Sequence, residues 1–153
     1  MFFIMPYEIQ TVVKTESSLT GKSVRQIIIE KLRGDIVEKT FSPEIWHNLL
    51  KLDEIESLKR NWNGNKAKPL SKKLIKKTRF LIINLEKQPQ VFPTANNSIQ
   101  IEYDGDNNSY LEFQVTKENK ISYYMIDKTG KESSGSIPVS SFELNKIVEV
   151  FYG

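Results

Sequence analysis

Three side chains of this sequence have types and positions that catalysis could use. His47 is the only histidine and follows Trp46, so it is conceivable as a general base. Glu102 and Glu112 lie in two alternating segments and could face the same side of adjacent strands, as paired carboxylates do in glycosidases. However, alternation alone places polar side chains on one face of a sheet. The chain also has no cysteine, no second histidine for a metal and no recognisable serine nucleophile. We therefore predict no catalytic residue, no metal site and no cofactor.

Two ligand-binding motifs are present only in part. Thr20 to Ser23 matches the end of a phosphate-binding loop, but the first glycine of that motif would fall at Glu16. Asp104 to Asn108 matches the start of a calcium loop, but the twelfth position is Val115, which has no carboxylate. We interpret both segments as ordinary turns.

A block of positive charge is the most informative feature of the chain. Between Ser57 and Leu85 there are nine basic residues and no Asp or Glu. Removing these nine from the 22 Lys and Arg leaves 13 basic against 19 acidic residues, so the net charge of +3 conceals a basic segment in an acidic protein. Such a segment favours an anionic partner. The candidate partner-binding residues are the aromatic Trp62 and the basic Lys59, Arg60, Lys66, Lys68, Lys72, Lys73, Lys76, Lys77 and Arg79.

The composition of this block indicates the kind of partner. Lys72 and Lys73 fall in the first turn of an expected helix, where cations oppose the helix dipole at a cost of a few tenths of a kcal/mol each. An anion site would offset that cost, although a solvated lysine-rich surface has the same composition. Lysine predominates over the arginine that reads bases, which favours an acidic protein surface, with nucleic acid as a further possibility.

Three functions remain open at this stage. The first hypothesis is a small non-enzymatic binding protein that engages a macromolecular partner through the basic helix, as an inhibitor or antitoxin-like antagonist. The second is a nucleic-acid-binding regulator that contacts phosphates with the same lysines. The third is an uncharacterised hydrolase, whose activity would depend on His47 or the strand carboxylates.

Length and composition set the expected organisation. With 153 residues, of which 39% are hydrophobic, the chain is expected to form one domain with its own core. The absence of cysteine suits a reducing compartment, and no run is long and apolar enough to span a bilayer. We expect a cytoplasmic protein with no membrane partner. Its oligomeric state cannot be read from the residues.

The N-terminal part has the less regular pattern. Residues 7–13 alternate between apolar and polar, which predicts a half-buried strand that Ser17 to Gly21 interrupts. Residues 23–33 predict a helix that ends at Gly34, although three consecutive isoleucines also permit a strand.

The central part shows helical periodicity. From Pro43 to Trp62, apolar residues recur every three or four positions, which predicts a helix that restarts at Asp53, with Asp53 and Glu56 as a capping box. Asn61 to Asn65 should end it in a turn. Ser71 then begins a second amphipathic helix that continues to about Lys87.

The C-terminal part changes to the two-residue period of strands. Strands are predicted at 99–103, 111–115, 121–126 and 136–139, and short polar loops between them indicate an antiparallel meander. Ser140 and Glu143 should box the start of a closing helix. The fold class is therefore α+β: a single domain, 1–153, with helices packed on an antiparallel sheet of three to five strands.

Part of the chain resembles a group of small, largely uncharacterised bacterial proteins. The shared features are Asn61-Trp62-Asn63-Gly64, the segment Phe92-Pro93-Thr94 and the strand Ile99-Gln100-Ile101-Glu102-Tyr103. Relatives often have Asp at the third place of the first motif. The resemblance implies a helix-turn-helix packed on an antiparallel sheet over residues 58–153, and implies no activity. Residues 1–57 form the variable N-terminal region outside it.

Overall fold

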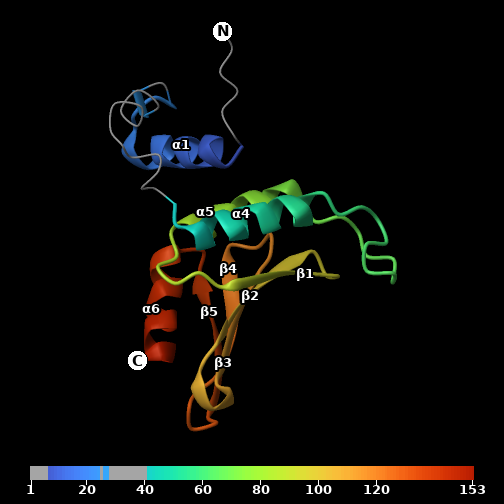
Figure 1. Ribbon diagram of the computed structural model, residues 1–153, viewed down its shortest axis with the longest axis vertical. Coiled ribbons are helices and arrows are strands. Elements are labelled where there is room, and N and C mark those ends of the chain that lie inside the picture. Colours follow the sequence, from blue (N-terminus) through green and yellow to red (C-terminus); the bar gives the residue numbers. More distant parts are fainter. Residues whose placement is uncertain (1–6, 25, 28–40) are drawn as a thin grey trace.

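The computed structural model describes residues 7–24, 26–27 and 41–153. These residues form an α+β fold in which helices pack on one face of a five-stranded antiparallel sheet (Figure 1). The predicted fold class, strand number and C-terminal helix are confirmed. Among the described residues, no helix is long and apolar enough to cross a membrane.

The sheet is a meander whose strands lie side by side in chain order. A 3-10 turn, η1 (Asp106–Asn108), joins the second strand to the third. The strands are β1 (Gln90–Thr94), β2 (Ser98–Asp104), β3 (Tyr110–Val115), β4 (Lys120–Ile126) and β5 (Glu132–Pro138).

Two edges of the sheet differ from the prediction. The sequence did not predict β1, because Pro93 interrupts its pattern, yet an edge strand tolerates proline. The predicted strand at 136–139 begins earlier, at Glu132, and pairs with β4 over its full length. Its serine-rich sequence lacks a hydrophobic alternation because β5 is the other edge and is largely exposed.

The core lies between the inner face of the sheet and two helices, α4 (Pro43–Glu56) and α5 (Lys72–Ile83). The inner face of the sheet is made by alternate residues of β2 and β3, as their period predicted. The closing helix α6 (Ser141–Tyr152) adds three side chains to it. Fully buried members from the sheet and the two helices include Ile99, Ile101, Leu111, Phe113, Leu49, Leu52, Leu74 and Ile82.

Helix α4 is one continuous helix. Ser42 caps its start, because its side-chain oxygen accepts a hydrogen bond from the Ile45 amide at 3.3 Å. The prediction of a restart at Asp53 with a capping box was wrong. The apolar stripe runs unbroken to Ile55, and Asp53 and Glu56 use their carboxylates on a residue of α5 instead.

The two later helices begin where capping residues predict. Ser71 accepts from the Leu74 amide at the start of α5, and Ser140 accepts from the Glu143 amide at the start of α6. Helix α5 ends at Ile83, four residues short of the predicted end. Gln88 explains this early end, because its amide nitrogen donates to the carbonyl oxygens of Ile82 and Leu85 and so satisfies them without a further turn.

The first described element is a helix, α1 (Tyr7–Thr20), where the alternation predicted a strand. That prediction was wrong because the run contains no Gly or Pro before Gly21, and α1 packs along α5 rather than joining the sheet. Gly21, at φ 70°, ends it in the left-handed conformation that glycine tolerates. Of the predicted helix at 23–33, residues 24, 26 and 27 are helical, and 25 and 28–33 lie outside the described residues.

Tyr103 should make stability depend on alkaline pH. Its ring is buried, and its hydroxyl donates to the backbone oxygen of Lys87 at 2.7 Å. Burial, with a smaller contribution from Tyr152, raises the pKa of Tyr103 well above its usual value of about 10. The Tyr103 hydroxyl therefore ionises at a lower pH in the unfolded protein than in the folded protein. Its contribution to the free energy of unfolding is complete below about pH 10 and decreases as the pH rises above that value.

Denaturant unfolding at about pH 8 and about pH 11 would measure this effect. We expect Tyr103→Phe to lose stability at the lower pH, by about 1 kcal/mol for the missing hydrogen bond, and to show a smaller further loss at the higher pH than wild type. A pH-dependent loss as large in Tyr103→Phe as in wild type would contradict the assignment.

Candidate partner-binding surface

The loop between α4 and α5 is held in one conformation by asparagine side chains. The Asn61 side-chain oxygen accepts from the Lys66 amide at 2.8 Å, and the Asn63 oxygen accepts from the Ala67 amide at 3.1 Å. Asn61 itself has φ 66°, a left-handed value that asparagine adopts more readily than most residues. The loop projects beyond the end of α4 and the start of α5 (Figure 1), and these side-chain hydrogen bonds hold its backbone in place.

Trp62 anchors this loop from inside. Its ring is half-buried and packs against the core, and its Nε1–H donates to the Lys68 carbonyl oxygen at 3.0 Å. The sequence allowed either a binding epitope or a packing residue at this position. These contacts agree with the packing role, because the ring packs on the core and the ring nitrogen donates its hydrogen bond to the protein's own backbone.

Seven of the nine predicted basic residues are exposed, four on this loop and three along the first half of α5. We call these seven the basic surface. The described segment from 57 to 85 contributes no carboxylate side chain to it. Two of its members stand in the first turn of α5, where the helix dipole adds positive potential. The basic surface consists of Lys59, Arg60, Lys66, Lys68, Lys72, Lys73 and Lys76.

Arg79 does not belong to the basic surface, contrary to the prediction. Its side chain is fully buried between α5 and α4, with the guanidinium 2.5 Å from the Asp53 carboxylate and 2.7 Å from the Glu56 carboxylate. The periodicity placed Arg79 on the polar side of α5 because it counted one buried face. The helix is in fact buried over a wider arc, since α1, α4 and the sheet all contact it.

Lys77 is also occupied within the protein, which corrects its prediction as a partner-binding residue. Its ammonium donates to the carbonyl oxygens of Thr116 at 2.8 Å and Glu118 at 2.6 Å, and so ties α5 to the end of β3. Desolvation, together with the charge of Lys73, lowers the pKa of Lys77. A partner would have to break both hydrogen bonds to use this cation.

Helix α1 borders the basic surface on one side. An apolar depression of about 430 Å³ separates α1 from α5, and Leu19 and Phe80 lie on its two walls. The stems of Lys73 and Lys76 line the same depression. Long lysine stems commonly cover apolar surface while the ammonium stays in water. Helix α1 thus lies beside the α5 part of the basic surface.

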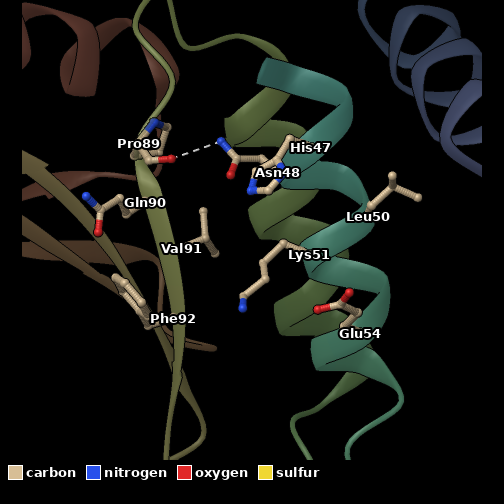
Figure 2. Close-up of a pocket in the computed structure, with 9 residues that line it drawn as sticks. All are labelled: His47, Asn48, Leu50, Lys51, Glu54, Pro89, Gln90, Val91 and Phe92. Atoms are coloured by element: carbon tan, nitrogen blue, oxygen red, sulfur yellow. Dashed lines mark hydrogen bonds between the residues drawn. The ribbon is translucent and has the colours of Figure 1, made fainter. Parts of the chain in front are cut away.

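A second concave region lies between α4 and β1 (Figure 2). It is a groove of about 440 Å³, within the range of roughly 300–1,000 Å³ that is usual for ligand sites. His47 lines this groove, one helical turn before Lys51. None of the nine residues lining the groove is a Ser, Thr or Cys that His47 could activate as a nucleophile.

The open face of the sheet carries a hydrogen-bonded polar cluster. Glu102 and Glu112 are direct cross-strand partners, so the prediction that they share a face is confirmed. Gln100 Nε2 donates to Glu102 at 2.6 Å and Glu112 at 2.8 Å, and the Tyr110 hydroxyl donates to Glu112 at 2.7 Å. Burial and the bond to Glu112 raise the pKa of Tyr110. Sequence reasoning missed Gln100 and Tyr110, although their period-two spacing from the carboxylates could have indicated them.

The described residues hold no group of three His, Cys, Asp or Glu side chains that could bind a metal ion. The seven cations of the basic surface are all exposed. Comparison with models of protein families, with curated proteins and with solved structures found no match to this chain.

Proposed function

We propose that this protein is a small non-enzymatic binding protein of the cytoplasm that engages an acidic macromolecular partner through the basic surface. It would act as an inhibitor or antitoxin-like antagonist by covering the partner's surface. The observation that carries the proposal is the exposure of seven cations on a loop and helix with no carboxylate among them.

The nearest carboxylates strengthen this proposal. Asp53 and Glu56, at the end of α4, would offset the positive potential of the adjoining loop if they were unpaired. The buried Arg79 pairs with both of them instead. Arg79 offsets one of these two negative charges, so the four cations of the loop keep a net positive potential that would steer an acidic partner toward the loop and the start of α5.

The residue types favour a protein partner over nucleic acid. With Arg79 buried, Arg60 is the only arginine left in the basic surface, and arginine is the side chain that most often reads bases. The ring of Trp62, which could have stacked on a base, packs inward. Lysines alone suit phosphates or carboxylates, so nonspecific nucleic-acid binding is the alternative that an experiment must separate.

The test is affinity purification from an extract of the native host, with half of each sample treated with nuclease. We compare wild type with Lys72→Glu/Lys73→Glu/Lys76→Glu, which spares the structural Lys77. Lys117→Glu/Lys128→Glu/Lys131→Glu is the control, because it makes the same charge change on exposed residues near the ends of the sheet.

We expect a protein partner that resists nuclease, is retained by the control and is lost by the α5 variant. Its affinity, measured with purified proteins, should decrease as salt increases, because salt screens exposed charges over about 10 Å at 0.1 M. Recovery of nucleic acid alone would move the function to the phosphate-binding alternative. Equal recovery by all three proteins would show that the basic surface is solvated surface only.

A further inference from the structure

The depression between α1 and α5 combines apolar walls with nearby positive charge. Helix α1 lies beside α5 (Figure 1), and Leu19 and Phe80 face the space of about 430 Å³ between the two helices. Leu19 is 71% exposed, although its side chain is large and apolar. Single exposed apolar residues are ordinary on protein surfaces, but Leu19 forms the wall of a concave region. Concave apolar surface of this kind is typical of binding sites.

Lys77 gives the depression a wall that is already ordered. Its ammonium is held by the carbonyl oxygens of Thr116 and Glu118, at 2.8 Å and 2.6 Å, so its four-carbon stem is held in place where it lines the depression. Side chains that are ordered before binding lose less conformational entropy when a partner arrives. The apolar part of the site is therefore largely formed in the free protein.

Lys73 and Lys76 place two cations beside these apolar walls. Both side chains are exposed, and among the described residues no carboxylate lies within ion-pair distance of either ammonium. Of the seven described residues that line the depression, three are lysines and none is acidic. Residues three positions apart on a helix are neighbours on one face, about one turn apart. A ligand that suits this site must therefore combine apolar groups with negative charges at a similar spacing.

We propose that the acidic partner docks in this depression with an amphipathic helix. Two apolar side chains of that helix would pack between Leu19 and Phe80, and Asp or Glu side chains beside them would pair with Lys73 and Lys76. Docking of an amphipathic helix into an apolar groove is an established mode of recognition. This inference rests on the proposed function and adds the form of the partner's binding segment.

The dimensions of the depression suit a helix of two to three turns. Along α5 its lining extends from Lys73 to Phe80, which is about 10 Å at about 1.5 Å per residue. A dry cavity of about 150 Å³ accepts one benzene ring. A depression of about 430 Å³ therefore has room for about two apolar side chains. A helix presents two such side chains on one face when they are three or four residues apart.

Other occupants match the site less well. A second copy of this chain, bound by the same face, would bring its own cationic patch against this one. A nucleic-acid strand offers phosphates to the lysines but no aliphatic side chain to the apolar walls. A fatty acid has an apolar chain but a single carboxylate, which can pair closely with only one of Lys73 and Lys76. An acidic amphipathic helix matches both the walls and the two cations.

The first test selects ligands for wild-type protein from a displayed library of helical peptides of about fifteen residues, a length at which isolated helices begin to form. We expect enriched peptides with two apolar residues three or four positions apart and Asp or Glu beside them. A synthetic peptide of the enriched sequence should bind with a dissociation constant of roughly 10–100 μM, because a free peptide must order when it binds. Failure to enrich this pattern would overturn helix docking, whereas the proposed function is decided separately by the purification experiment.

Substitutions in the protein then separate the apolar walls from the charges. Leu19→Ala changes no charge and should weaken peptide binding by about tenfold or more. Leu50→Ala is the matched control, because Leu50 is also an exposed helical leucine, at 56%, and lies on α4 outside the depression. Lys73→Gln/Lys76→Gln should weaken binding by about tenfold at low salt and by less at high salt.

These variants distinguish the inference from the function on which it rests. Binding that depends on the lysines but not on Leu19 would overturn docking in the depression and leave the basic surface as the site of the proposed function. Binding that depends on Leu19 but not on the lysines would overturn the acidic helix as the occupant.

Methyl NMR signals of wild-type protein locate the peptide directly. The Leu19 signals should shift on titration with the selected peptide, and the Leu50 signals should not. Unmoved Leu19 signals would overturn the inference. Dodecanoate is added as a competitor, and displacement of the peptide at equal or lower concentration would show that the site takes an anionic lipid instead. Leu19 signals that shift with protein concentration alone, in a protein that is dimeric in solution, would show that a second copy occupies the depression and would also overturn it.

Discussion

Replacing Asp53 and Glu56 together by Asn and Gln should destabilise the protein by about 3 kcal/mol or more. Both carboxylates pair with the guanidinium of Arg79, whose side chain has no exposed surface. The neutral amides keep the shape of the acids and can still accept hydrogen bonds, but they leave a buried positive charge without a counterion. Denaturant unfolding measures the change in the free energy of unfolding.

The opposite substitution should cost less. Arg79→Met removes the buried charge and leaves Asp53 and Glu56, whose side chains are 38% and 28% exposed and so remain partly hydrated. We expect this variant to be more stable than the double variant by at least about 1 kcal/mol. Adding Arg79→Met to the double variant should restore stability, because no buried charge then remains. Additive losses in the triple variant would contradict this account.

Replacing Trp62 by Ala should cost about 2–3 kcal/mol and should loosen the loop that carries four of the seven cations of the basic surface. A fully buried Trp typically loses about 3–5 kcal/mol on truncation, and Trp62 is half-buried. The substitution also removes the hydrogen bond from its Nε1 to Lys68. Because ordering a mobile loop opposes association, partner binding should weaken although no charge has changed.

Two milder substitutions separate packing from polar contacts. Trp62→Phe keeps an aromatic ring without the N–H and should lose about 1 kcal/mol. Asn63→Asp keeps an oxygen that can accept from the Ala67 amide and should leave stability within about 0.5 kcal/mol. Asn63→Ala removes that oxygen and should cost more. Unfolding curves and amide exchange in the loop measure these effects, and equal stability of Trp62→Ala and wild type would disprove the anchoring role.

The network around Arg79 links stability to the proposed function. It buries one cation of the basic block, which pairs with two carboxylates at the end of α4 and offsets one of their two charges. The double variant at Asp53 and Glu56 would lower stability while it makes this region more positive by two charges. The charge reversal at Lys72, Lys73 and Lys76 would instead make the region more negative with little effect on stability, since these side chains are exposed. Comparing the two variants distinguishes loss of fold from loss of binding.

Much of the fold follows from local patterns in the sequence. The period of two in β2 and β3, and the capping serines of α5 and α6, predicted elements that the structure confirms. Asn61 and Gly64 predicted the turn after α4, where both residues have positive φ. These features depend on backbone propensity and on one buried face, which neighbouring residues alone can specify.

Tertiary structure decided what local patterns could not. Residues 7–13 alternate like a strand but form part of α1, because packing along α5 outweighs a short local pattern. Strand β1 can be recognised only from its pairing with β2, because Pro93 interrupts the alternation of apolar and polar residues in its sequence.

The candidate site divides in the same way. The sequence by itself determined that a segment of nine cations without carboxylates exists, because charge is a property of composition. Only the tertiary structure decided that Arg79 is buried, that Lys77 is bound to backbone oxygens and that seven cations remain exposed. It also created the groove beside Val91, which joins residues some forty positions apart in the chain. Burial and proximity depend on which elements pack together, and a charge count contains no such information.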